Sequence, residues 1–314
     1  MACAPDDERF KNAKKIIFAG LDNSGKTSIN TVISENTANL GLIKPTYLIK
    51  RNTFQFLDYD MIACDMGGQK KYILSYMKEP GKYFGETDAC IFVIDVQDAD
   101  RLVEATNYFK DILMQFTSLA INPCIFVFFH KVERILREGN AEDSSNMNTA
   151  QQIINEINAG RFTLEFHMTT IMDVWSITKA FARVMNYLNP LDELLAPPLK
   201  NLVSKVNAMI VVLMDEHMIP IVQNVQTKQS DELISNAAPY MFGLKQSLDK
   251  IQQKPSVMVT FTWEDFAFIL ATTTDAQMTL HVMLIGEKGS IKQDMIDVEI
   301  TNTFNDIFAA LRNK

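Results

Sequence analysis

Cysteine is scarce in this chain of 314 residues, and its spacing excludes the usual cysteine-based sites. Cys3, Cys64, Cys90 and Cys124 form no C-x-x-C pair, so the sequence predicts neither a zinc site nor a disulfide framework. Three of the four lie in apolar runs. We therefore expect buried, reduced thiols of the kind that cytosolic proteins carry.

Long apolar runs and lipidation signals are also missing from the sequence. No apolar stretch approaches the length that spans a bilayer, and the acidic N-terminal segment lacks the apolar stretch of a signal peptide. Position 2 is Ala2 rather than the glycine that myristoylation requires, and the final ALRNK contains no prenylation box. We expect a cytoplasmic protein without a direct membrane anchor, which becomes peripheral to membranes only through partners.

Basic residues are outnumbered, which argues against a nucleic-acid partner. Lysine and arginine total 30 against 38 aspartate and glutamate residues, giving a formal net charge of −8. A protein that binds nucleic-acid backbones needs a basic surface instead. Hydrophobic residues make up 47% of the chain, enough for a sizeable core, and the length favours two domains.

The first part of the chain alternates apolar runs with helical patterns. Continuous apolar runs at 88–95 and 123–129 are typical of strands covered on both faces, as in a parallel sheet. The other predicted elements are strands at 14–20 and 163–169, two strands within 54–65 joined by a turn at 58–60, helices at 27–35, 99–118 and 177–188, and a surface loop at 134–150. This order predicts a doubly wound α/β domain over residues 14–190, after an N-terminal extension at 1–13. Its sheet should be mixed and mostly parallel, with helices on both faces.

A second pattern begins after Pro190, Pro197 and Pro198, which mark a boundary. Residues 191–204 are predicted to be a linker or helix. The following elements are a hairpin at 208–224 with its turn near 215–217, a helix at 231–252, strands near 256–263, 266–273 and 277–285, and a helix at 300–312. Residues 205–314 are therefore predicted to form an α+β domain with a meandering antiparallel sheet.

A phosphate-binding loop follows the first predicted strand. Residues 20–27, GLDNSGKT, fit the pattern G-x-x-x-x-G-K-[ST]. The glycines let main-chain N–H groups turn toward nucleotide phosphates, and the N-terminus of the next helix faces the same anion. Lys26 is expected to bring its charge to the β and γ phosphates, and Thr27 to coordinate Mg²⁺. The predicted binding residues are Gly20, Leu21, Asp22, Asn23, Ser24, Gly25, Lys26, Thr27 and Ser28.

Two further segments are expected to complete the phosphate site. Asp65 ends a predicted strand and is placed to hold Mg²⁺, Gly68 offers its N–H to a γ-phosphate, and Gln69 orients the attacking water. Thr46 would be a second metal ligand present only with the γ-phosphate, which would make its loop a switch. The predicted metal ligands are Thr27, Thr46 and Asp65, and the predicted catalytic residues are Lys26, Gly68 and Gln69.

Residues 130–133, HKVE, directly follow the strand at 123–129 and resemble the base-binding N-K-x-D loop of GTPases, which implies base recognition there. The stem of Lys131 would stack on the base, and the Glu133 carboxylate would accept two hydrogen bonds from guanine N1 and N2. A solvated charged pair is the alternative for these two residues. For His130, a satisfied polar residue is favoured over a catalytic role. Thr170 and Ile171 stand where a main-chain N–H would contact the base.

On these residues the chain resembles the Rag/Gtr GTPases, which join a small-GTPase domain to a C-terminal roadblock-type domain. The family's H-K-x-[DE] matches residues 130–133, with His130 in place of the bracing Asn of the N-K-x-D found in other GTPases. Residues 169–190 look like the family's T-S-I-x-D…A-F…V…L-x-P segment. Residues 92–100 and 128–133 look most like the C and D branch. In contrast, GLDNSGKT and Gly67-Gly68-Gln69 look Arf-like, where the C/D branch has Pro-Gly-Gln.

The resemblance implies GTP or GDP with Mg²⁺ as ligands and GTP hydrolysis that is slow without a partner. It also implies a homo- or heterodimer formed through a roadblock/longin-like domain at 205–314, with effector or scaffold proteins as further partners. The implied role is nutrient or membrane-associated signalling.

Several functions remain open at this point. The chain is either a GTP-hydrolysing switch, a nucleotide-loaded scaffold with negligible hydrolysis, or a P-loop enzyme of another class such as a nucleotide kinase. The segment 65–69 and Lys131 argue against the third. For the second half, pairing with another copy at a sheet edge is favoured over a self-contained domain.

Overall fold

The structure, a computed structural model, describes residues 12–34, 46–57, 59–225, 230–251, 256–275 and 278–313. Most of the predicted N-terminal extension, Cys3, and Asp58 of the predicted turn lie outside these residues. The chain divides into two compact units, residues 1–180 and 181–314. The predicted domain limits near residues 190 and 205 stay predictions, and each unit is described by itself.

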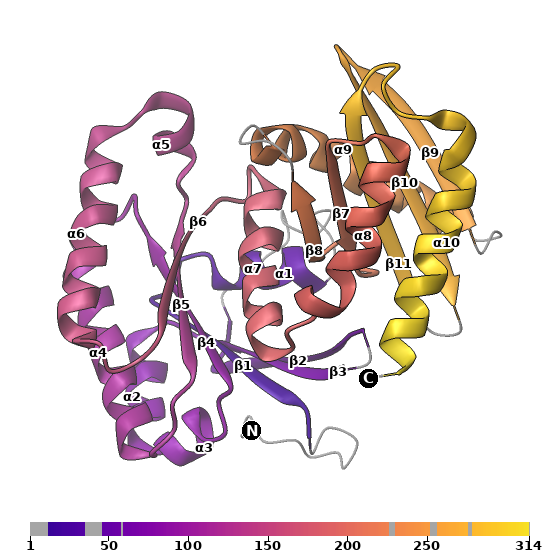
Figure 1. The fold of residues 1–314 in the computed structure, drawn as a ribbon. Helices are drawn as coiled ribbons and strands as arrows, with labels where there is room; N and C mark the ends of the chain where they lie inside the picture. The colour runs from indigo at the N-terminus through magenta and orange to yellow at the C-terminus, as the bar shows by residue number, and fades with distance from the viewer. Residues whose placement is uncertain are drawn as a thin grey trace. The chain divides into compact units, whose positions relative to one another are not determined.

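The first unit is built on a six-stranded sheet with the strand order β2-β3-β1-β4-β5-β6 (Figure 1). The strands are β1 (Lys14–Ala19), β2 (Ile49–Phe56), β3 (Tyr59–Met66), β4 (Ala89–Asp95), β5 (Cys124–His130) and β6 (Leu164–Thr169). Only β2 runs antiparallel to its neighbour, and the other four pairings are parallel. The predicted mixed, mostly parallel sheet is confirmed. Because the strands are parallel, the ends of β1, β3, β4 and β5 meet at one edge, where ligands bind in such folds.

Helical segments connect these strands. They are α1 (Lys26–Ser34), α2 (Lys70–Lys78), α3 (Pro80–Phe84), the 3₁₀ turn η3 (Ala99–Arg101), α4 (Leu102–Ser118), α5 (Glu133–Glu138) and α6 (Ala141–Asn158). After β6, α7 (Val174–Leu188) begins in the first unit and ends in the second. Helix α1 packs against β3, α4 packs against β4, and α6 packs against α4. The helices at 27–34, 99–118 and 177–188 agree with the prediction.

The surface loop predicted at 134–150 is wrong, because α5 and α6 occupy that segment. The side chain of Asn140 caps α6 by accepting a hydrogen bond from the main-chain N–H of Asp143 at 2.9 Å. The Asp143 carboxylate in turn accepts one from Arg134 Nε at 2.7 Å. Ala150 and Ile154 are fully buried on the inner face of α6. The polar residues that suggested a loop therefore form the capped first turn and outer face of an amphipathic helix.

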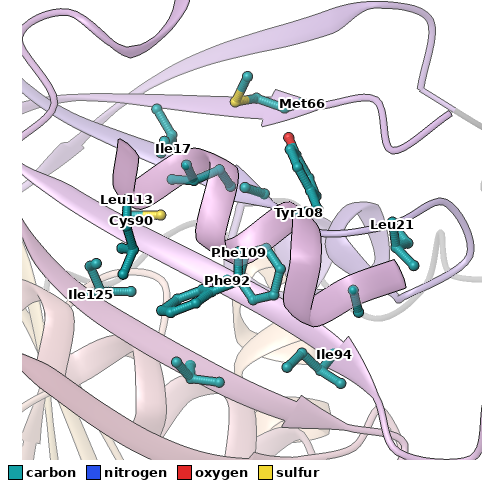
Figure 2. Packing of buried hydrophobic residues seen from close by; sticks show 14 of the residues in the cluster. Ile17, Leu21, Met66, Cys90, Phe92, Ile94, Tyr108, Phe109, Leu113 and Ile125 are labelled. Atoms are coloured by element: carbon teal, nitrogen blue, oxygen red, sulfur yellow. The ribbon is translucent and has the colours of Figure 1, made fainter. Parts of the chain in front are cut away.

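The core under α4 fixes the central strands. Figure 2 shows Phe109 and Leu113 of α4 directed onto Phe92, Cys90 and Ile125 of the strands. The rings of Phe92 and Phe109 meet edge to face with centroids 5.1 Å apart. Such dense aromatic and aliphatic packing holds the strand ends, and thus the loops that follow them, in fixed positions.

Cysteine chemistry agrees only partly with the expectation from sequence. Cys90 and Cys124 are free and buried, as predicted. Cys64 is also fully buried but is disulfide-bonded, so the expected absence of disulfides is wrong for that residue.

The second unit contains a five-stranded antiparallel sheet with the order β8-β7-β11-β10-β9. Its elements are α8 (Asp192–Val206), β7 (Ile210–Met214), β8 (Pro220–Val225), α9 (Ser230–Ile251), β9 (Ser256–Trp263), β10 (Phe266–Asp275), β11 (Met278–Glu287) and α10 (Gln293–Arg312). The predicted hairpin, helix and three-stranded meander are confirmed. The final helix begins at Gln293, seven residues before its predicted start at residue 300, and its early residue Ile296 is buried.

Pro197 and Pro198 lie inside α8 rather than at a break in the chain. Each removes one main-chain hydrogen bond and crowds the preceding turn. The helix persists because Leu195, Leu199 and Leu202 bury one face of it completely or nearly so. Burial of these leucines outweighs the unfavourable local propensity. Among the described helices, none combines the length and the apolarity needed to cross a bilayer.

Candidate active site

A cavity of about 380 Å³ lies at the carboxyl edge of the first sheet. It is lined by Asp22, Asn23, Gly25, Lys26, Thr27, Ser28, Thr46, Gly67, Gly68, Gln69, His130, Lys131, Glu133, Ile171 and Met172. The other predicted site residues do not line the cavity and are buried: Gly20, Leu21, Ser24, Asp65 and Thr170. The structure therefore gathers all of the predicted residues at one place, although they come from five separate stretches of sequence.

The phosphate-binding loop between β1 and α1 requires its two outer glycines. Gly20 has φ of +138° and Gly25 has φ of +98°, conformations that other residues rarely adopt. A Cβ on Gly20 would lie 2.3 Å from the carbonyl oxygen of Val93, and one on Gly25 would lie 2.3 Å from Cδ2 of His130. The loop thus curls tightly against the ends of β4 and β5, and α1 begins at its end.

Lys26 is a buried cation at the floor of the cavity. Its Nζ donates hydrogen bonds to the carbonyl oxygen of Leu21 at 2.6 Å and to Ser24 Oγ at 3.4 Å. Burial lowers the pKa of Lys26 to about 8, while the charges of Asp65 and Asp22 act in the opposite direction. Its hydrogen-bond partners are neutral, so an anion in the cavity would stabilise the charged form.

The three predicted metal ligands converge on one carboxylate oxygen. Thr27 Oγ1 and Thr46 Oγ1 each donate a hydrogen bond to Asp65 Oδ2, at 2.7 and 2.9 Å, and the two hydroxyl oxygens are 2.8 Å apart. Asp65 is fully buried, and its Oδ1 has no hydrogen-bond partner among the described residues. Burial raises the pKa of Asp65, whereas the charge of Lys26 and both hydroxyls lower it. Hydroxyl and carboxylate oxygens with one buried oxygen still unsatisfied fit a hard cation such as Mg²⁺.

Gly68 and Gln69 approach the phosphate-binding loop from the end of β3. A Cβ on Gly68 would lie 2.1 Å from the main-chain nitrogen of Asp22, so only glycine allows this close approach. Gln69 precedes α2 with extended φ and ψ of −69° and 139°, and its side chain makes no capping hydrogen bond. Both residues line the cavity.

Tyr76 joins the two loops that carry Thr46 and Gly68, a role that no sequence pattern predicts. Its buried hydroxyl donates to the carbonyl oxygen of Leu48 at 2.5 Å and lies 3.1 Å from that of Gly67. The main-chain N–H of Gly67 donates to the same Leu48 oxygen at 2.7 Å. Only the fold brings this hydroxyl to residues 28 and 9 positions away.

The predicted base-binding residues are held by partners at the opposite end of the cavity. Lys131 Nζ pairs with Asp95 Oδ2 at 2.6 Å rather than with Glu133. Thr170 Oγ1 donates to Glu133 Oε2 at 2.6 Å, and Gln97 Nε2 donates to Oε1 at 2.8 Å. Burial alone would raise the pKa of Glu133, but these hydrogen bonds outweigh it and hold the pKa below its ordinary value.

The residues that hold this end were not predicted. Asp95 ends the predicted strand at 88–95 and Gln97 follows it, and a polar residue at the carboxyl end of a parallel strand was the available signal.

His130 braces this end of the cavity against the phosphate-binding loop. It is 1% exposed, and its Nδ1 lies 3.0 Å from Thr169 Oγ1. Burial, with the charge of Lys131, lowers the pKa of His130 to about 4, so the ring is neutral at pH 7. Its close packing on Gly25 supports the structural role favoured from sequence.

The model of the Gtr1/RagA G protein conserved region matches residues 15–242, which is more than two thirds of the chain. The chain belongs to this family of G proteins. The resemblance to Rag/Gtr-type small GTPases is therefore confirmed. The second unit, with its antiparallel sheet and helices, is consistent with a roadblock- or longin-like domain.

Individual relatives include both Gtr and Arf-like proteins. The chain is 29% identical over 195 residues to GTP-binding protein gtr2 of Schizosaccharomyces pombe, covering 61% of this chain and 59% of that protein. It is 36% identical over 111 residues to ADP-ribosylation factor-like protein 2 of Arabidopsis thaliana, covering 34% of this chain and 57% of that protein. The chain thus spans somewhat more than half the length of these relatives. The solved Arl6 BBS3 small GTPase from Trypanosoma brucei, with the bound nucleotide analogue GppNp, aligns with a TM-score of 0.45 at 19% identity, covering 55% and 96% of the two chains.

Proposed function

We propose that this family member is a guanine-nucleotide switch that binds GTP or GDP with Mg²⁺ and hydrolyses GTP slowly. The observation that carries the proposal is that Thr27 and Thr46, which line the cavity with Lys26, both hydrogen-bond to buried Asp65. A buried cation next to an oxygen-rich cation site suits a phosphate chain with its counter-ion. Thr46 reaches this cluster from a separate loop, so its position would report whether the γ-phosphate is present.

The residues proposed to bind the phosphates and Mg²⁺ each have a role. Thr27, Thr46 and Asp65 would hold the Mg²⁺, which when bound neutralises charge on the phosphate oxygens. Lys26 would exchange its main-chain partner, the carbonyl of Leu21, for a phosphate oxygen. The N–H of Gly68 would face the γ-phosphate. Gln69 has no side-chain cap to make at α2, so its amide is available to orient a water molecule.

At the other end, Glu133 is proposed to select guanine. Its ionised carboxylate is held in place from one side by Thr170 and Gln97. Each carboxylate oxygen retains further acceptor capacity, which the N1 and N2 donors of guanine would use. Lys131 forms an ion pair with Asp95, and its aliphatic stem would stack on the base. A main-chain N–H at Thr170 or Ile171 would also contact the base.

We propose slow turnover because the cavity lining includes no arginine among the described residues. An arginine supplied to the transferred phosphate accelerates such reactions by roughly 10³–10⁵-fold. Full activity would then need a partner protein.

We also propose that the second unit forms a homo- or heterodimer, with effectors recruited by the nucleotide state in nutrient or membrane-associated signalling. Strands β8 and β9 are the two edges of its sheet. Tyr240 of α9 and Trp263 of β9 are 60% and 42% exposed, with ring centroids 6.3 Å apart. Unpaired edges with exposed aromatic residues favour pairing with another chain.

Native purification tests the core of the proposal. The released nucleotide is identified by chromatography, and light scattering gives the mass in solution. We expect GDP or GTP in the wild-type protein, no nucleotide with Lys26→Ala, and reduced single-turnover hydrolysis with binding intact for Gln69→Leu. A protein that takes up neither guanine nucleotide in magnesium buffer would contradict the assignment. Binding without any turnover, even with a co-purified partner, would identify a nucleotide-loaded scaffold instead.

A further inference from the structure

An arginine outside every recognised motif, Arg101, binds a residue of the phosphate-binding loop. Arg101 closes η3, the turn that follows β4. Its Nη2 pairs with Asp22 Oδ1 at 2.5 Å, and its Nη1 donates to the main-chain carbonyl of Asp22 at 3.2 Å. The same guanidinium donates from Nε to Glu104 Oε2 at 3.1 Å. Two of its nitrogens thus hold both the carboxylate and the backbone of one loop residue.

Asp22 lies beside Gly68, whose N–H is proposed to face the γ-phosphate. Gly68 packs so closely on it that a Cβ would lie 2.1 Å from the Asp22 nitrogen. Asp22 also lines the cavity, and its charge acts on buried Lys26. A carboxylate at this place opposes the binding of phosphate, because the loop must receive a chain of phosphate anions and like charges repel.

We propose that Arg101 is a positioning residue that neutralises and orients Asp22, and thereby allows the site to accept the γ-phosphate of GTP. The proposal rests on the assignment of the cavity to guanine nucleotides. In the absence of the guanidinium, the Asp22 carboxylate would be free to turn toward the cavity and to repel the terminal phosphate. GDP lacks that phosphate, so its binding depends less on the ion pair. Arg101 acts here through Asp22 and need not touch the nucleotide.

The test compares affinities for GTP and GDP, using the non-hydrolysable analogue GppNp in place of GTP. We expect Arg101→Ala to weaken GppNp binding about tenfold more than GDP binding. The unpaired Asp22 carboxylate is partly screened by solvent but remains close to the proposed γ-phosphate position. Arg101→Lys should have an intermediate effect, because lysine keeps the positive charge but cannot contact both the carboxylate and the main-chain carbonyl of Asp22 as the guanidinium does. Glu104→Gln is the matched control: it removes the other ion pair of Arg101 and should leave the GppNp-to-GDP affinity ratio unchanged.

A second-site change separates this role from a merely structural one. In the background of Asp22→Asn there is no carboxylate to neutralise, so Arg101→Ala should then change the affinity ratio little. Retained GDP binding also reports that each variant is folded. The proposal is overturned if Arg101→Ala lowers the GppNp-to-GDP affinity ratio equally in the wild-type and Asp22→Asn backgrounds, or if it leaves that ratio unchanged. Either result leaves the nucleotide assignment intact. Failure of the wild-type protein to bind either nucleotide overturns both.

Discussion

The hydroxyl of Tyr76 donates a 2.5 Å hydrogen bond to the carbonyl oxygen of Leu48, and so links helix α2 to the loop that carries Thr46. The Gly67 N–H donates to the same oxygen at 2.7 Å. Thr46 and Gly68 therefore belong to backbone segments joined at one point. Tyr76 therefore couples Thr46, the proposed metal ligand, to Gly68, the proposed γ-phosphate contact, through hydrogen bonds to the main chain of Leu48 and Gly67.

Tyr76→Phe should uncouple these segments while preserving the packing of the ring. The buried ring contacts Tyr83 edge to face at 5.0 Å, a contact that phenylalanine retains. We expect a loss of about 1 kcal/mol in unfolding free energy from the deleted hydrogen bond. Nucleotide release measured with a fluorescent GppNp analogue should become several-fold faster, with release of GDP changed less. Equal acceleration for both nucleotides would show that Tyr76 supports only the fold.

The carboxylate of Asp65 should control the dependence of nucleotide binding on Mg²⁺. Asp65→Asn keeps the size of the side chain and removes the charge that suits a divalent cation. We expect chelation of Mg²⁺ to accelerate nucleotide release strongly in the wild-type protein and little in the variant. Stopped-flow release with and without EDTA measures this. Asp60→Asn is the control on the same strand, because Asp60 Oδ1 accepts a hydrogen bond from Gln55 Nε2 at 3.1 Å at an exposed position. A variant that responds to EDTA as the wild type does would remove Asp65 from the metal site.

The sequence predicted most of this site because its local patterns are strong. The loop at residues 20–27 and the short apolar strands around it depend on neighbours in the chain, so spacing and hydropathy identify them. Tyr76 and Arg101 were missed because their roles arise from contacts across 28 and 79 positions of sequence. No local pattern distinguishes either residue from an ordinary helical tyrosine or arginine.

Errors in the fold have a related origin. The polar residues that dominate 134–150 predict a loop, although Ala150 and Ile154 supply a buried face of α6. Pro197 and Pro198 leave a linker and a helix as alternatives for residues 191–204, because proline propensity is local and the packing of Leu195 and Leu199, which holds α8 together, is not. Where tertiary packing opposes local propensity, sequence alone favours the wrong structure.

Acid should destabilise the first unit through His130. Burial holds its folded-state pKa at about 4, against an ordinary value of 6.5. The unfolded chain therefore binds a proton between these values that the folded chain does not, so stability falls as pH decreases from 6.5 toward 4, by about 3 kcal/mol at most. His130→Gln cannot take up this proton. Chemical denaturation at pH 7 and pH 4.5 should show that the wild type loses more stability than the variant over that interval. Parallel losses would mean that His130 is protonated without penalty.

The last prediction concerns the choice of base, for which Glu133 is proposed to accept hydrogen bonds from guanine. Glu133→Gln keeps the length of the side chain and its contacts with Thr170 and Gln97 within reach, but replaces one acceptor oxygen by an NH₂ donor. A donor facing the guanine amino group is repulsive, whereas xanthine carries a carbonyl oxygen at that position. Because hydrogen bonds to charged groups contribute about 1.5–3 kcal/mol, we expect GDP affinity to fall roughly 10- to 100-fold and XDP affinity to rise relative to the wild type.

Titration calorimetry with GDP, XDP and ADP measures this change in preference. Glu138→Gln, on the same helix α5 but exposed, is the matched control and should bind GDP as the wild type does. If Glu133→Gln weakens GDP and XDP to the same extent, the carboxylate positions the loop through Thr170 rather than contacting the base. Unchanged GDP affinity would mean that the base lies elsewhere, because removal of a contacting carboxylate cannot leave recognition of guanine N1 and N2 intact.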